Sequence, residues 1–144
     1  MPKHLAALAA LCLSVVASPA SAQQQCLHGP GETAEQVVRT REALTATRNI
    51  NNIQANQPGA AAGQYLRHDQ LSSSPFALKM RESTSDIVKR MSLEPGTDVL
   101  PDWQLTLDVT RQGYWFMIKD RRDPCGFAFV SNQQGVIFRS EPIR

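Results

Sequence analysis

The sequence predicts an α+β domain in which helices come first and an antiparallel sheet follows. Three observations support this class: a capping box opens a helix at Thr33, apolar residues recur at helical spacing over 75–91, and the period changes to two residues after position 103. Helices and strands that are segregated along a chain are typical of α+β domains. We therefore expect an N-terminal helix and a second amphipathic helix packed on a four-stranded antiparallel meander.

Ahead of this domain, residues 1–22 have the pattern of a cleaved secretory signal peptide. Lys3 precedes an uncharged apolar run over 5–16, and small residues follow at 20–22. The run is about a dozen residues long, whereas a helix that spans a membrane needs roughly 20. We expect a single domain over 23–144 that is periplasmic or secreted and has no stable membrane anchor after cleavage.

The cysteines give the next expectation. Because Cys12 falls inside the predicted signal, Cys26 and Cys125 form the remaining pair, and an even pair in an oxidising compartment predicts a disulfide. Two alternatives are a pair of free thiols and a zinc site that combines Cys26 with His28, although that spacing fits no standard zinc pattern. No metal ligand is assigned.

The first helix is predicted over about 33–57. Thr33 and Gln36 have the capping-box spacing, and Pro58 lies just beyond the end. Its apolar residues occupy two nearly opposite sides, with Val37 and Leu44 on one and Ala43, Ala46, Ile50 and Ile53 on the other. Such a helix is either bent or covered on two sides.

A loop with Tyr65 as its aromatic anchor is expected over 58–74, and the second helix over 75–91. Ser74 provides an N-cap and Pro75 stands at the first helical position, where its missing amide proton costs nothing. One arc of this helix carries Phe76, Met80, Ile87 and Met91. The pattern indicates an amphipathic helix on the core, and the alternative is a methionine-lined groove for a partner.

A connector is expected over 94–101, and the four strands are predicted over 103–110, 114–119, 125–131 and 136–139. In the first strand, apolar residues from Trp103 to Val109 alternate with polar ones, as a strand with one wet face requires. The strand over 114–119 carries apolar groups on both faces, so we expect it to be central. Short turns between strands predict antiparallel pairing.

Charge and motifs indicate little chemistry. The 15 basic and 13 acidic side chains give a net charge of +2, and about +1 without Lys3, which disfavours a nucleic-acid partner. His28 and His68 lie in no HExxH or GxSxG motif and are expected to be solvated loop residues. Asp120 and Asp123 flank a predicted turn, where aspartate favours local backbone hydrogen bonds. No catalytic residue or cofactor is assigned.

A candidate contact surface lies on and beyond the central strand. Its members are Trp115, Met117, Lys119, Arg121 and Arg122. The central strand offers apolar groups on both sides, whereas one helix layer covers only one of them. The adjacent cations suggest affinity for an anionic glycan, a phospholipid head group or an acidic protein surface, and the alternative is a solvated hairpin tip.

Short stretches of the chain prompt a family comparison. They are Leu44 with Arg48-Asn49-Ile50-Asn51 and Gln54, then Gly63-Gln64-Tyr65, Gly113-Tyr114, Cys125-Gly126-Phe127 and Gly135-Val136-Ile137. Over roughly 40–141 the chain resembles the soluble domain of type IV pilin-like and pseudopilin-like proteins. The resemblance implies a helix packed across an antiparallel sheet. The prepilin-peptidase site and long apolar helix of pilins are not found here, so the resemblance does not imply a pilus subunit.

These observations favour an exported, non-catalytic protein that acts by contact with a protein or cell-envelope component. A first alternative is a small-molecule sensor of PAS-like or Cache-like type, in which the sheet cups a metabolite against the helices. A second alternative is a hydrolase that uses the carboxylates of Asp120 and Asp123.

Overall fold

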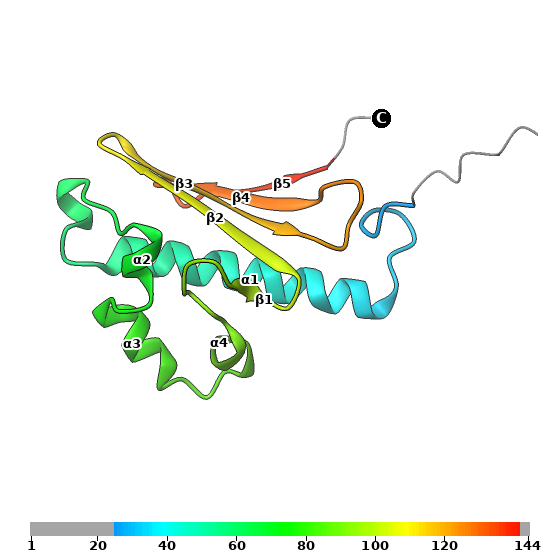
Figure 1. The fold of residues 1–144 in the computed structure, drawn as a ribbon, viewed down its shortest axis with the longest axis horizontal. Helices are drawn as coiled ribbons and strands as arrows, with labels where there is room; N and C mark the ends of the chain where they lie inside the picture. Colours follow the sequence, from blue (N-terminus) through cyan, green and yellow to red (C-terminus); the bar gives the residue numbers. More distant parts are fainter. Residues whose placement is uncertain (1–24, 142–144) are drawn as a thin grey trace, which may run out of the picture.

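The computed structural model describes residues 25–141, so the predicted signal peptide lies outside the described residues. The helices are α1 (Ala34–Asn56), a short 3-10 helix η1 (Ala60–Ala62), α2 (His68–Leu71), α3 (Pro75–Arg81) and α4 (Asp86–Arg90). The strands are β1 (Asp98–Leu100), β2 (Trp103–Thr110), β3 (Gly113–Asp120), β4 (Ala128–Asn132) and β5 (Ile137–Ser140). The α+β class is confirmed. Figure 1 shows the α-helices on one side of the sheet.

Helix α1 is the longest element and begins where the capping box predicts. The side chains and backbone amides of Thr33 and Gln36 bond reciprocally, which satisfies two amides at the helix start. The helix contacts β4 on one side and both α3 and α4 on another. The helix is therefore covered on two sides, which is one of the two explanations expected for its split apolar pattern. Within residues 25–141, no helix is long and apolar enough to span a membrane.

The single second helix predicted over 75–91 is wrong in extent, because two short helices occupy that range. Helix α3 ends with Glu82 as its C-cap, and α4 starts after Ser85. Three Ser or Thr residues in succession at 83–85 separate them, and the Ser83 hydroxyl accepts a bond from the Ser85 amide. Such side chains offer the backbone an alternative to helical bonding, which explains the break.

The sheet has five antiparallel strands in the order β1-β2-β3-β4-β5, not the four that were predicted. The extra strand is β1, which falls in the segment expected to be a connector and buries Val99 and Leu100. Three residues are too few to show a two-residue period. Strand β3 is central, as predicted, and pairs with β2 from Trp103↔Asp120 to Thr110↔Gly113.

The segment between α1 and α2 is held by glutamines of α1 and its C-cap. The Gln54 side chain is fully buried; it donates to the Leu66 carbonyl at 2.7 Å and accepts from the Leu66 amide at 2.9 Å. Gln57 accepts from the Gly59 amide at 2.8 Å and donates to the Gln64 carbonyl. These bonds fix the backbone of this loop against the end of α1.

Candidate functional site

The two faces of β3 differ in what covers them. Tyr114, Phe116, Ile118 and Asp120 are buried beneath α1, whereas Trp115, Met117 and Lys119 point to the opposite side. We call that opposite side the outer face, and Figure 1 shows none of the described helices over it. The side chains alternate because successive residues of a strand point to opposite faces.

Four apolar side chains meet on the outer face, and we call them the apolar patch. They are Trp115, Met117, Val130 and Phe138. Met117 is directly opposite Val130, and Val130 is directly opposite Phe138, so three of them form a row across β3, β4 and β5. Trp115 is 41% exposed and Phe138 55%. Exposed apolar groups that lie together are typical of an interaction surface.

One charged residue lies at each end of this patch along the strands. Lys119 is two residues beyond Met117, and Asp108 is directly opposite Trp115. Both side chains are exposed. The outer face therefore has an apolar centre, a cation at one end and an anion at the other.

Two members of the predicted contact surface contact carboxylates instead of joining the patch. The Arg121 guanidinium lies 3.2 Å from the Asp98 carboxylate, and that of Arg122 lies 3.9 Å from Glu35 at the start of α1. Of the five predicted residues, the structure thus brings Trp115, Met117 and Lys119 together. Each of these two guanidinium groups therefore has an acidic neighbour on the surface.

A disulfide ties the start of the described chain to the turn between β3 and β4. Cys26 and Cys125 are bonded, as predicted, across a sequence separation of 99. Next to this bond, both oxygens of Asp123 are occupied, one by the Leu27 amide and the other by the Phe127 amide, each at 2.8 Å. The segment before α1 is therefore fixed at one end of the sheet.

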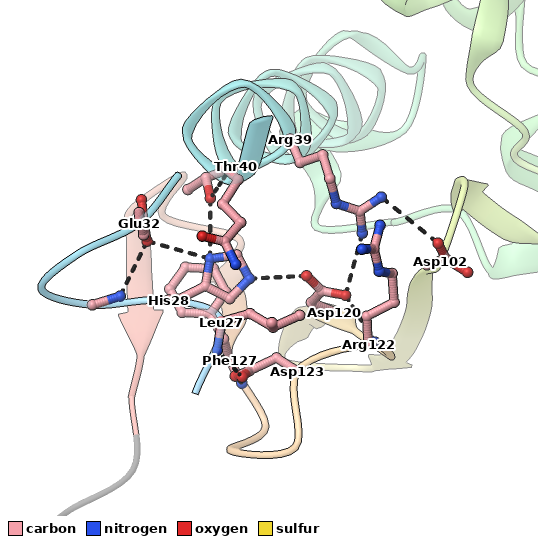
Figure 2. A network of polar contacts seen from close by, with 12 residues as sticks. Leu27, His28, Glu32, Arg39, Thr40, Asp102, Asp120, Arg122, Asp123 and Phe127 are labelled. Carbon is pink, nitrogen blue, oxygen red and sulfur yellow. Dashed lines mark hydrogen bonds and ion pairs between the residues drawn. The ribbon is translucent and has the colours of Figure 1, made fainter. Parts of the chain in front are cut away.

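The expectation that His28 is a solvated loop residue is wrong. Its side chain is only 2% exposed; Nε2 lies 2.9 Å from the Asp120 carboxylate and Nδ1 lies 3.1 Å from the Thr40 hydroxyl. Glu32 approaches Nδ1 at 3.4 Å, and the imidazole stacks on the Phe127 ring at 3.9 Å between centroids. Figure 2 shows this group, which we call the His28 cluster.

Asp120 connects the His28 cluster to the rest of the domain. Its second oxygen accepts a bond from the Arg122 amide at 2.9 Å and lies 3.4 Å from the Arg39 guanidinium. The carboxylate thus makes the local backbone bond predicted for a turn aspartate, and it also makes a long-range contact with His28 that was not predicted. Every buried side-chain nitrogen and oxygen in the described part of the chain has a hydrogen-bond partner.

The cluster places Thr40, His28 and Asp120 in the order of a hydroxyl nucleophile, a base and an orienting carboxylate. However, the Thr40 hydroxyl donates to the Gln36 carbonyl at 2.9 Å, and His28 is almost fully buried. A hollow of about 230 Å³ beside residues 25–33 is lined by His28 but not by Thr40. A substrate in that hollow would not meet the hydroxyl, so the geometry favours a structural role.

Burial shifts the pKa of two titratable groups outside the His28 cluster. Burial, with a smaller contribution from Tyr65, raises the pKa of Tyr114 to about 12. The Tyr114 hydroxyl donates to Asn51 at 3.1 Å, and Asn51 donates to Ser131 at 2.8 Å, which links α1 to β3 and β4. The expectation that His68 is a solvated loop residue is also wrong, because His68 begins α2 and is half-buried, and desolvation lowers its pKa from the usual value.

Comparison of the chain with protein-family models, with curated proteins and with solved structures finds no match. Within residues 25–141, no group of three or more His, Cys, Asp or Glu side chains is arranged to hold a metal ion.

Proposed function

We propose that this is an exported, non-catalytic protein that acts by binding another exported or envelope protein through the apolar patch. One observation carries the proposal: helices cover the inner face of the sheet, whereas the outer face carries a row of apolar side chains that nothing in the described chain covers. Uncovered apolar surface favours association, because contact with a partner removes it from water.

The dimensions of the apolar patch favour an amphipathic helix as the part of the partner that binds. Neighbouring strands are about 4.8 Å apart, so the row from Met117 to Phe138 spans roughly 10 Å. Apolar residues at positions i, i+3 or i+4 and i+7 of a helix span about the same length. Helix α1 packs on the inner face of the same sheet, and a second helix outside would complete a three-layer arrangement. An acidic residue of the partner helix near Lys119 and a basic one near Asp108 would complement the charges at the two ends of the apolar patch.

Export is supported by the disulfide between Cys26 and Cys125, since such bonds form mainly in the periplasm or outside the cell. The signal peptide predicted over 1–22 and the pilin-like architecture remain hypotheses in the same direction. A sensor that encloses its ligand among the helices is less well supported, because the hollow between α1, α3 and α4 has a volume of about 20 Å³, enough for roughly one water molecule.

The proposal is tested by comparing two exposed apolar residues on different sides of the domain. A partner is first identified by photo-crosslinking from position 138 in the native envelope, and its affinity is then measured with purified components. We expect Phe138→Ser to weaken binding at least about tenfold, since an anchor in a small interface contributes more than about 1.4 kcal/mol. Leu78→Ser, on α3 and also half-exposed, is the matched control and should change affinity less than twofold.

Two outcomes would contradict this assignment. If the two serine variants lose affinity equally, the apolar patch is not the binding surface. If crosslinks from position 138 join two copies of this chain, the patch is a self-association surface and the helical partner is wrong.

A further inference from the structure

A second surface, at the opposite end of the domain from the disulfide, forms a groove of about 670 Å³. One wall is the loop between α1 and α2, and the other is the end of β2 where it turns into β3. The residues that give the groove its chemistry are Gln64, Tyr65, Arg67, Gln70 and Arg111. We call it the arginine groove. It shares no residue with the apolar patch and does not depend on the proposed function.

The walls of the arginine groove are held in place by bonds on both sides. Buried Gln54 bonds both backbone groups of Leu66, and the Tyr65 ring packs edge-on against Tyr114 at 4.8 Å between centroids. In the opposite wall, the Thr110 hydroxyl donates to the Gly113 carbonyl at 3.3 Å and accepts from the Gln112 amide. A preorganised groove binds a ligand with a smaller entropic cost than a mobile one.

The charge of the groove is positive. Arg67 and Arg111 lie on opposite walls, and the residues that line the groove include no Asp or Glu. Arg111 makes no ion pair with any residue from 25 to 141, whereas Arg67 shares its charge with the neighbouring Asp69 at 3.3 Å. Both members of that pair are more than half exposed, so the attraction between them is screened by water and costs little to replace.

The uncharged groups of the groove suit a ligand rich in hydroxyls. The Gln70 side-chain oxygen accepts from the Arg67 amide, which leaves its NH₂ group directed to no described partner. Gln64 and Tyr65 add an amide and a phenol, each able to donate and to accept. Tyr65 is also an amphipathic ring on which the apolar face of a sugar can rest.

We propose that the arginine groove binds a carboxylated saccharide, with the two guanidinium groups pairing the carboxylates and the amides bonding the hydroxyls. Guanidinium matches a carboxylate with two parallel hydrogen bonds. The lining residues come from both walls, so a ligand that pairs both guanidinium groups spans the groove. An acidic oligosaccharide, such as a short run of hexuronate units, combines the required charge, hydroxyls and size.

The experiment titrates the mature, disulfide-bonded protein with trigalacturonate, with galacturonate monomer, with neutral galactotriose and with inorganic phosphate. We expect saturable binding of trigalacturonate, and binding at least about tenfold weaker for galactotriose, which lacks the carboxylates. Arg111→Ala and Arg67→Ala should each weaken trigalacturonate binding about tenfold, as loss of a hydrogen bond to a charged group does. Arg41→Ala, an exposed arginine on α1 that does not line the groove, is the matched control and should change affinity less than twofold.

Amide chemical shifts separate groove binding from general attraction between charges. Ligand-induced shifts should concentrate at Tyr65, Arg67 and Arg111. The proposal is overturned if galactotriose binds as well as trigalacturonate, if phosphate displaces trigalacturonate at equal concentration, or if Arg41→Ala loses as much affinity as Arg111→Ala. Equal affinity for the monomer and the trimer would show that one uronate unit suffices, and would overturn the oligosaccharide part.

Discussion

The inner and outer faces of the same sheet differ in what their polar and apolar groups do. On the inner face, Phe116 is fully buried and Asp120 is 1% exposed, and the buried side-chain nitrogens and oxygens of residues 25–141 all have hydrogen-bond partners. On the outer face, Phe138 and Asp108 have the same chemical types but stand in water. Residue type alone therefore does not assign a role here. The side of the strand on which a residue falls decides whether it stabilises the fold or is available to a partner.

The largest contrast is expected between two phenylalanines. Phe116→Ala should lower the free energy of unfolding by about 4 kcal/mol, because it removes a ring from a closely packed core and leaves a cavity. Phe138→Ala should change it by less than about 0.5 kcal/mol, since that ring is 55% exposed. Urea unfolding followed by circular dichroism measures both. A loss above about 2 kcal/mol for Phe138→Ala would mean that the outer face is covered within this chain.

A slightly smaller loss is expected when the disulfide is removed. The double substitution Cys26→Ser and Cys125→Ser frees the unfolded chain from a loop of 99 residues and should cost about 3 kcal/mol. Removal of the disulfide should not alter partner binding at the outer face, because that surface lies on β3, β4 and β5. Unfolding in urea with and without reductant gives the stability change. The idea of a separate outer surface is wrong if the folded double variant no longer binds its partner.

Two aspartates, one on each face, should also differ in their contribution to stability. Asp120→Asn removes the charge that faces His28 at 2.9 Å and Arg39 at 3.4 Å, and should cost about 2 kcal/mol. Asp108→Asn, on the outer face, should cost less than about 0.5 kcal/mol. Chemical denaturation at neutral pH measures the change in unfolding free energy of both variants. Equal effects would show that the His28 cluster contributes little to folding.

The sequence predicted the features that depend on neighbours along the chain. The capping box at Thr33, the alternation from Trp103 to Val109 and the central position of β3 are all present, because each depends on a local period or cap. The disulfide could also be predicted, since the cysteine count and the expected compartment are enough to indicate it. The break between α3 and α4 had a local signal in the Ser and Thr residues at 83–85, and the apolar arc over 75–91 outweighed it.

The features that the sequence did not predict depend on partners far along the chain. His28 meets Asp120 across 92 positions, and Asn51 meets Ser131 across 80, so neither pairing leaves a local pattern. Strand β1 is three residues long, which is too short for its alternation to be read. Arg121 and Arg122 are close to Trp115 in the sequence, but the chain turns after β3 and directs them to Asp98 and Glu35.

The smallest expected effect concerns pH and also separates the two faces. The unfolded Tyr114 phenol ionises near pH 10, whereas burial raises the pKa of the folded one to about 12. The unfolded state therefore binds fewer protons than the folded state between these values, and stability falls as pH rises from about 10 to about 12, by at most about 2 kcal/mol. Tyr114→Phe loses the bond to Asn51, about 1 kcal/mol at neutral pH, but does not ionise. The stability curves of the two proteins should cross within that window, as measured by urea unfolding after brief exposure to alkali. Curves that stay parallel would mean that the phenol is hydrated in the folded protein, and that the inner face is less well sealed beneath α1 than its paired polar groups indicate.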